Sequence, residues 1–292
     1  MEKEIALCPD PELYREILER VRGGCRPAER PEALFLCGQP GCGKTSLAES
    51  LRDKGKAYIG GDDFREYHPD RDYIRERFPD YFAEITQPFV SACVRLLLRD
   101  LSKARIPLIV EGTLRNPKVQ VRTAEALLAE GYRADMVIPL ASAECAWQRT
   151  LRRARDAEAR GTCVRLVPLG KYNGTVLHLP SSLRQAEESG LFASIRLAGT
   201  NGRTDLLWHP GDAGPRPSDR LTEALDLPAW RQSAPRHKRE YARAMQKARE
   251  RQGLVRTDRS VMVEEIPAMR EEDRRPEERE EAVYAADIGW ER

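Results

Sequence analysis

The sequence predicts an α/β fold in which helices cover both faces of a parallel sheet. Three observations support this prediction. Short apolar runs alternate about five times with longer stretches of helical spacing, which is the pattern of a parallel sheet. A glycine-rich loop directly follows the first apolar run. Acidic residues follow two later runs, at the strand ends where open α/β sheets bind ligands.

The spacing of apolar residues places the individual elements. A leading helix is expected over residues 9–24, because its apolar residues recur at helical spacing and two glycines end it. The expected strands are residues 33–37, 57–59, 107–110 and 136–140. The expected helices after them are residues 45–51, 81–104, 119–130 and 143–160. A small hairpin is expected over 194–208, because Asn201-Gly202 lies between two apolar runs.

Composition excludes several classes of protein. The 292 residues contain 49 Lys and Arg against 47 Asp and Glu, and this balance argues against specific nucleic-acid binding. No apolar run reaches the roughly 18 residues of a membrane span, and the first residues lack a secretory signal. We therefore expect a cytoplasmic protein without a membrane partner. Seven cysteines without a C-x-x-C spacing argue against a disulfide framework or a zinc site.

Charge is distributed unevenly along the last third of the chain. Residues 231–259 hold ten Lys and Arg against three Asp and Glu, whereas residues 260–292 hold five against eleven. We expect a main domain over 1–210, a linker over 211–230 and a charged segment over 231–292 that is helical or partly disordered. That segment is either solvated with self-compensating charge or a docking surface for a partner or an anionic ligand.

The most specific motif is a phosphate-binding loop at residues 38–45, which matches G-x-x-x-x-G-K-[ST] at every fixed position. The loop consists of Gly38, Gln39, Pro40, Gly41, Cys42, Gly43, Lys44 and Thr45. Its glycines let successive N–H groups point at phosphate oxygens. Lys44 can reach the β- and γ-phosphates, and the Thr45 hydroxyl can ligate Mg²⁺. The motif predicts nucleotide binding but does not separate kinases from ATPases, GTPases and motors.

Acidic residues follow the second and third expected strands. Asp62 could accept the proton of a substrate hydroxyl during phosphoryl transfer, although it or Asp63 could instead cap a helix. Glu111 could help to hold Mg²⁺ or its water shell, or it could be an incidental acid at the end of a strand. Phosphoryl transfer also needs cations near the developing charge. Candidate cations are Arg149, Arg152, Arg153, Arg155, Arg160 and Arg165.

With these motifs in one order, the chain resembles the zeta-toxin family over roughly residues 9–208. The resemblance is carried by FLCGQPGCGKTSL at 35–47, GGDDFREYHP at 60–69, LIVEGTLR at 108–115, EALLAEGYRADMVIPL at 125–140, TLRR at 150–153, CVRLVP at 163–168, HLPSSL at 178–183 and SGLFASIRL at 189–197. Members of this family are bacterial P-loop kinases that phosphorylate UDP-N-acetylglucosamine, usually with a neutralising epsilon-type antitoxin. The resemblance therefore implies a P-loop kinase-type sheet, ATP and Mg²⁺ as cofactors, and a small helical antitoxin as partner.

The resemblance also implies roles for individual residues. The implied catalytic residues are Asp62 as base, Lys44, Arg153 and Arg165. The implied nucleotide contacts are residues 38–45 with Arg153 and Arg165, and the implied metal ligands are Thr45 and Glu111. The implied substrate-binding residues are Asp62, Arg65, Arg95, Glu111, Thr113 and Arg115. Arg95 stands where the family has an acidic residue that contacts the sugar nucleotide, and such a charge reversal changes which ligand a pocket tolerates.

We therefore expect an ATP-dependent kinase that phosphorylates a hydroxyl of UDP-N-acetylglucosamine or a related sugar nucleotide, as the toxin of a toxin–antitoxin pair. A kinase of another acceptor, such as a nucleoside, NAD or an antibiotic, is one alternative. A non-catalytic ATP-binding regulatory module is another, and Asp62 distinguishes them because only a kinase needs it. An ATPase motor is less favoured, because the sequence shows no clear sensor or coupling element.

Overall fold

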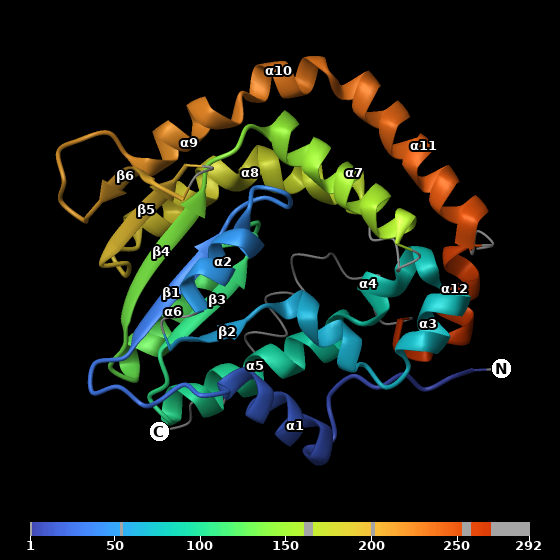
Figure 1. Cartoon of the computed structure of the whole chain (residues 1–292), viewed down its shortest axis with the longest axis horizontal. Coiled ribbons are helices and arrows are strands. Elements are labelled where there is room, and N and C mark those ends of the chain that lie inside the picture. The colour runs from blue at the N-terminus through green and yellow to red at the C-terminus, as the bar shows by residue number, and fades with distance from the viewer. Residues whose placement is uncertain (1, 53–54, 161–165, 200–201, 253–257, 270–292) are drawn as a thin grey trace. The chain divides into compact units, whose positions relative to one another are not determined.

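The chain folds into two compact units, each assembled from segments that are distant in sequence. The structure, a computed structural model, describes residues 2–52, 55–160, 166–199, 202–252 and 258–269 (Figure 1). Unit 1 comprises Met1–Gly24, Ile59–Ala104 and Gly253–Arg292. Unit 2 comprises Cys25–Tyr58 and Arg105–Gln252. Arg165 and Asn201, which the sequence singled out, lie outside the described residues.

Unit 2 is built on a six-stranded sheet with the order β2-β3-β1-β4-β5-β6, to which unit 1 adds only the last residue of β2. The strands are β1 (Glu32–Cys37), β2 (Ala57–Ile59), β3 (Leu108–Gly112), β4 (Arg133–Pro139), β5 (Ser194–Ala198) and β6 (Thr204–Trp208). Parallel pairing joins β3 to β1, β1 to β4 and β4 to β5, whereas β6 runs antiparallel to β5. The α/β class and the hairpin at 194–208 are therefore confirmed.

Apolar side chains bury both faces of this sheet. On one face Leu36, Ile109 and Val137 form a buried cluster with residues of α2 (Lys44–Arg52). Because successive residues of a strand point to opposite faces, Phe35 lies on the other face. There its ring packs edge-on against Phe192, with the ring centroids 5.3 Å apart. This double burial explains why the strands appear in the sequence as continuous apolar runs.

Among the described residues, six further helices belong to unit 2. They are α6 (Pro117–Ala129), α7 (Ala143–Ala159), α8 (Leu169–Glu188), α9 (Pro217–Leu225), α10 (Leu227–Gln232) and α11 (Ala234–Gln252). Helices α9 and α10 lie where the sequence suggested a linker. Pro217 starts α9, whose Leu221 and Leu225 are fully buried, and the Asp226 side chain accepts a hydrogen bond from the N–H of Ala229 in α10. The three-part division of the chain stays a prediction.

Unit 1 is helical. Its elements are α1 (Pro11–Arg22), the 3-10 helices η1 (Gly61–Tyr67) and η2 (Pro79–Tyr81), α3 (Arg71–Arg77), α4 (Phe82–Ile85), α5 (Gln87–Lys103) and α12 (Arg259–Glu265). The single helix expected over 81–104 is in fact two helices that meet at Thr86. Pro88 explains the break, because proline has no N–H and its ring excludes the preceding helical turn. A buried cluster joins Ile5 near the N-terminus to Phe78, Phe82 and Met262.

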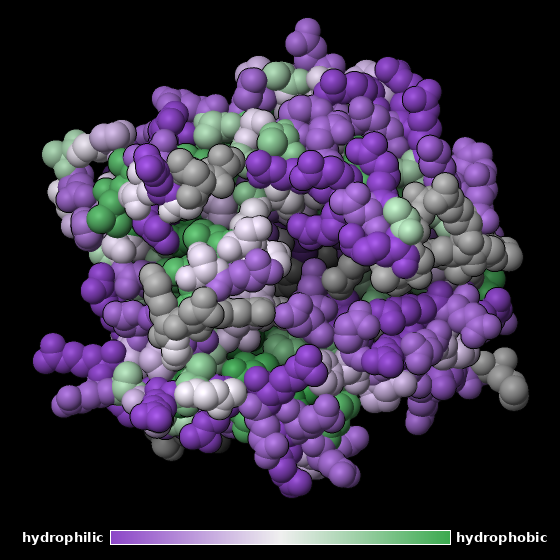
Figure 2. Space-filling view, in the orientation of Figure 1, coloured by the Kyte–Doolittle hydropathy of each residue, from purple (hydrophilic) through white to green (hydrophobic). Residues whose placement is uncertain are grey.

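The face of the molecule shown in Figure 2 is predominantly hydrophilic. Figure 2 shows charged and polar residues over most of the face in view, with small separate hydrophobic areas. Among the described residues the exposed large hydrophobic side chains are Leu7, Leu177 and Leu207. No helix in the described ranges is both long and apolar enough to cross a membrane.

Candidate nucleotide-binding site

The phosphate-binding loop joins β1 to α2, as its sequence predicts. Gly38, Gly41 and Gly43 have φ angles of +140°, +80° and +110°, which L side chains rarely adopt. Gly41 is constrained a second time, because a Cβ atom there would lie 2.1 Å from the carbonyl oxygen of Ala146 in α7. The loop therefore needs glycine both for its own curvature and for its close approach to α7.

Lys44 is buried near the end of the loop, with 8% of the residue exposed. Its Nζ donates hydrogen bonds to the carbonyl oxygens of Gly38 at 2.8 Å and Gln39 at 3.2 Å. Lys44 and the exposed Thr45 are the first two residues of α2, where unpaired N–H groups and the helix dipole favour an anion. A lysine cation and a helix N-terminus thus meet in one loop, which is a binding arrangement for phosphate.

Glu111 lies beside this loop, on the strand next to β1. Its position on β3 pairs with Leu36, and its Oε1 is 4.0 Å from the Lys44 Nζ. The hydroxyl of Tyr58 on β2 donates a hydrogen bond to the Glu111 Oε2. Sequence reasoning missed Tyr58, because a single sequence does not show that β2 and β3 are neighbours. Tyr58 and Lys44 together fix the carboxylate of Glu111 from two sides.

The residues at this edge suit a magnesium ion bound together with phosphate. Mg²⁺ prefers oxygen ligands and is usually held by one or two protein groups together with phosphate and water. The Thr45 hydroxyl and the Glu111 carboxylate supply such oxygen atoms. In the described part of the chain, no group of three or more His, Cys, Asp or Glu residues could hold a metal without other ligands. This donor set fits an ion that arrives with a nucleotide.

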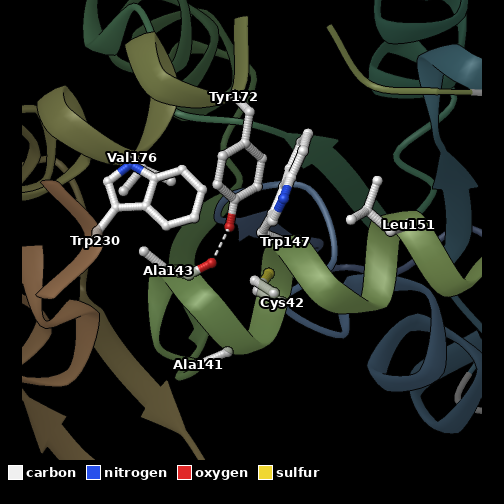
Figure 3. Packing of buried hydrophobic residues seen from close by; sticks show 9 residues of the cluster. Cys42, Ala141, Ala143, Trp147, Leu151, Tyr172, Val176 and Trp230 are labelled. Carbon is white, nitrogen blue, oxygen red and sulfur yellow. Dashed lines mark hydrogen bonds between the residues drawn. The ribbon is translucent and has the colours of Figure 1, made fainter. Parts of the chain in front are cut away.

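An aromatic cluster anchors the loop to three helices of unit 2 (Figure 3). Cys42 packs against a core formed by Trp147 of α7, Tyr172 of α8 and Trp230 of α10. The Tyr172 hydroxyl donates to the carbonyl oxygen of Ala143 at 2.6 Å (Figure 3). Burial raises the pKa of the Cys42 thiol, although the Lys44 charge opposes this effect. Cys42 is therefore a packing residue in a protonated state.

The arginines of α7 follow directly from this anchored region. Arg152, Arg153 and Arg155 are exposed, and Arg149 is half-buried. The first turn of α7 is fixed by its contact with Gly41 and by the aromatic cluster. These arginines are therefore carried by a helix that is packed against the loop. The second arginine that the resemblance implied, Arg165, lies outside the described residues.

The remaining site residues lie in two places. In unit 1, Asp62 is exposed on η1, which begins two residues after β2 ends, and Arg95 is half-buried on α5. Arg65 is buried, and its Nε donates to the Asp62 Oδ1 at 3.1 Å. In unit 2, the exposed Thr113 and half-buried Arg115 follow β3.

The segment after β3 has an unusual conformation. Leu114, between Thr113 and Arg115, is fully buried and has a φ angle of +55°. A left-handed conformation in a residue other than glycine costs about 1–3 kcal/mol and persists only where the surroundings enforce it. The buried side chain of Leu114 therefore fixes the segment that carries two of the predicted substrate-binding residues.

The fold and this site define a P-loop kinase-type nucleotide-binding protein, with a glycine-rich loop between β1 and α2 and an acid on the neighbouring strand. The sequence profile of the family described as Zeta toxin matches residues 15–210. The chain belongs to the zeta-toxin family, as the sequence resemblance indicated.

Individual relatives agree with this assignment. The chain is 29% identical over 189 residues to Toxin zeta of Enterococcus hirae, an alignment that covers 63% of this chain and 66% of that protein. It is 30% identical over 197 residues to Toxin PezT of Streptococcus pneumoniae serotype 4, covering 63% and 74% of the two chains. The matched part thus spans just under two thirds of the Enterococcus hirae toxin.

A solved structure shares the fold. A chain from the PezAT chromosomal toxin–antitoxin system of Streptococcus pneumoniae superposes with a TM-score of 0.66 at 21% sequence identity. This superposition covers 82% of the present chain and 98% of the other. A chain from a structure of AvrRxo1-ORF1 with AvrRxo1-ORF2 and sulphate ions gives a TM-score of 0.52 at 14% identity, covering 73% and 71% of the two chains. At these identities the likeness concerns the fold.

Proposed function

We propose that the protein is an ATP-dependent kinase that transfers the γ-phosphate of ATP to a hydroxyl group of a small molecule. One observation carries this proposal: the buried Lys44 lies within a glycine-rich loop and 4.0 Å from Glu111 on the adjacent strand. A cation for phosphate and an acid for a metal ion are the parts that phosphoryl transfer requires. Membership of the zeta-toxin family supports the same activity.

Each part of the site has a role in this reaction. The loop N–H groups and Lys44 would hold the β- and γ-phosphates, while Thr45 and Glu111 would bind the metal ion. Bound Mg²⁺ supplies positive charge that offsets the charge developing on the phosphate oxygens. The oxygen of the acceptor hydroxyl attacks the γ-phosphorus, and the bond from that phosphorus to the ADP oxygen breaks. The Asp62 carboxylate accepts the proton of the attacking hydroxyl. Arg153 and Arg165 stabilise the charge on the transferred group.

The proposed acceptor is UDP-N-acetylglucosamine or a related sugar nucleotide, with Arg95, Glu111, Thr113 and Arg115 among its contacts. Family membership supports this choice. The second candidate is a kinase of another acceptor, such as a nucleoside, NAD or an antibiotic, and the cation of Arg95 supports it because the charge of a pocket selects its ligand.

We also propose that the protein acts as the toxin of a toxin–antitoxin pair, with a small helical antitoxin as its partner. The related proteins of Enterococcus hirae and Streptococcus pneumoniae are named toxins, and the PezAT structure is of a toxin–antitoxin system. A neighbouring gene for a small helical protein, and suppression of growth arrest when both genes are expressed, would support the pair. Growth that is unaffected by expression of the chain alone would contradict it.

The test of the kinase is an acceptor screen with matched variants. The purified protein is incubated with ATP, Mg²⁺ and a panel of sugar nucleotides, nucleosides and NAD, and phosphorylated products are detected by mass spectrometry. We expect transfer by the wild type, a loss of several powers of ten in Lys44→Ala and Asp62→Asn, and near-normal transfer in the control Asp63→Asn. ATP binding without transfer to any acceptor would instead favour the regulatory module.

A further inference from the structure

We propose that Arg65 is a positioning residue, which holds the carboxylate of Asp62 in place and does not itself bind substrate. This inference rests on the proposed function, in which Asp62 is the base, and it gives Arg65 a role different from the one the sequence resemblance implies. All of the observations that carry it lie within unit 1.

The side chain of Arg65 is directed into the protein. Only 8% of it is exposed, whereas 71% of the Asp62 side chain is exposed. The Arg65 Nε donates to the Asp62 Oδ1 at 3.1 Å. Its Nη1 donates to the carbonyl oxygen of Ala83 at 2.8 Å and to the Thr86 Oγ1 at 2.6 Å, and its Nη2 donates to the Gln87 Oε1 at 2.7 Å. At least four of the five N–H donors of the guanidinium are therefore bonded to protein.

The acceptors of Arg65 are themselves held in place. Thr86 is fully buried, and its hydroxyl donates to the carbonyl oxygen of Phe82 at 2.7 Å, so its oxygen faces Arg65 as an acceptor. The break between α4 and α5 creates this arrangement, because the helix that ends at Ile85 leaves the Ala83 carbonyl oxygen available to Arg65. The helix break at Pro88 thus provides the acceptors that bind the guanidinium of Arg65.

A second contact holds the beginning of η1 against α5. A Cβ atom at Gly61 would lie 3.2 Å from the Val90 Cγ1, which shows that the backbone next to Asp62 is packed closely on α5. Gly61 and Arg65 therefore fix η1 on both sides of Asp62. The exposed carboxylate stands on a segment that is itself rigidly attached.

This attachment has two chemical consequences for a base. A fixed cation beside the carboxylate favours its ionised form, which is the form that accepts a proton. A fixed position also matters, because misplacement of a catalytic group by about 1 Å can reduce a rate by about 100-fold. A lysine at position 65 would supply charge but could not make the forked contacts of a guanidinium.

The test compares Arg65→Gln and Arg65→Lys with the control Arg15→Gln, which removes an exposed arginine of helix α1. We expect Arg65→Gln to lower kcat by about 10- to 100-fold with little change in the KM of either substrate. The acid limb of the pH–rate profile should move to higher pH, and carbon-detected NMR should show a raised Asp62 pKa. In Arg65→Lys, the Asp62 pKa should stay close to its wild-type value, whereas kcat should still be reduced. The control should match the wild type in each measurement.

A further variant keeps the test independent of the folding of Arg65 variants. Gln87→Ala removes one acceptor at an exposed residue, and we expect smaller changes in the same direction. An increase in the acceptor KM with unchanged kcat in Arg65→Gln would show a substrate contact and overturn the proposal. An unchanged Asp62 titration would overturn it as well. Equal transfer by the wild type and Asp62→Asn would refute the role of Asp62 as base, and no transfer by the wild type would refute the proposed function, while the NMR titration would still decide whether Arg65 holds Asp62.

Discussion

The glycines of the phosphate-binding loop allow a sharp test of its geometry, because Gly41 and Gly43 share a strained backbone but differ in their surroundings. Both have positive φ angles, so an alanine at either position costs about 1–3 kcal/mol in backbone strain. A Cβ at Gly43 would meet no atom within 4 Å, whereas at Gly41 it would lie 2.1 Å from the carbonyl oxygen of Ala146 and 3.0 Å from the Thr150 Cγ2.

The clash at Gly41 has no easy relief. The nearest atom belongs to the backbone of α7, and an ordinary contact of 3.4 Å requires the two segments to separate by about 1.3 Å. Helix α7 is held by the buried Trp147 and by the bond from Tyr172 to Ala143. Overpacking of this kind costs about 1–3 kcal/mol beyond the strain. We therefore expect Gly41→Ala to be about 1–3 kcal/mol less stable than Gly43→Ala.

Urea unfolding followed by tryptophan fluorescence measures this difference directly, because Trp147 and Trp230 lie in the cluster beside the loop. The wild type and both variants are compared in one buffer without nucleotide, so that only folding contributes. A parallel titration with ATP should show weaker binding in Gly41→Ala than in the wild type. Equal unfolding midpoints for the two variants would refute the close approach of Gly41 to α7.

Three other predictions concern packing, pH and thiol reactivity. Trp230→Ala should lower the free energy of unfolding by about 3–5 kcal/mol in urea, whereas the exposed control Leu207→Ala should change it by about 0.5 kcal/mol or less; equal effects would contradict the burial of Trp230. Burial lowers the pKa of His68, so the folded protein keeps this residue neutral while the unfolded chain takes up a proton near its ordinary value of 6.5. The free energy of unfolding should therefore fall as the pH drops from about 7.5 to about 5.5, and His68→Gln should reduce this dependence in urea titrations; an identical pH dependence in the variant would refute it. Burial raises the pKa of Cys37 to about 12, so iodoacetamide should label the exposed Cys8 and Cys145 before Cys37 in peptide mass spectrometry, and early labelling of Cys37 would contradict the structure.

Local features of the sequence predicted the sheet well. β2 occupies residues 57–59 and the hairpin residues 194–208, as expected, because apolar runs bounded by glycine or turn residues determine them locally. Helix α8 was not predicted, since Gly170, Gly174 and Pro180 all disfavour a helix interior. Burial of its residues Tyr172, Val176, Leu179 and Leu183 outweighs these local preferences. Tertiary packing of this kind cannot be judged from one sequence.

The sequence predicted only part of the candidate site, because some of its contacts are local and others join distant segments. The fixed spacing of the phosphate-binding loop brings Lys44 to its position, so a motif is enough to find it. The contact of Tyr58 with Glu111 depends on strand order, which spacing does not encode. The role of Arg65 depends on a helix break 21 residues further along the chain. Residues that act through long-range contacts were therefore either missed or given another role.

The packing of α10 and α11 bears on where this protein can be divided. The family profile ends at residue 210, yet Trp230 stacks on His237 with 3.8 Å between ring centroids and donates from its Nε1 to Asn173 in α8. A fragment cut at the family boundary would leave Trp147 and Tyr172 without part of their cover. We therefore expect a fragment that ends at residue 210 to be less stable than a chain that continues through α11, and any ligand that displaces α10 would loosen the core in which Cys42 of the phosphate-binding loop packs.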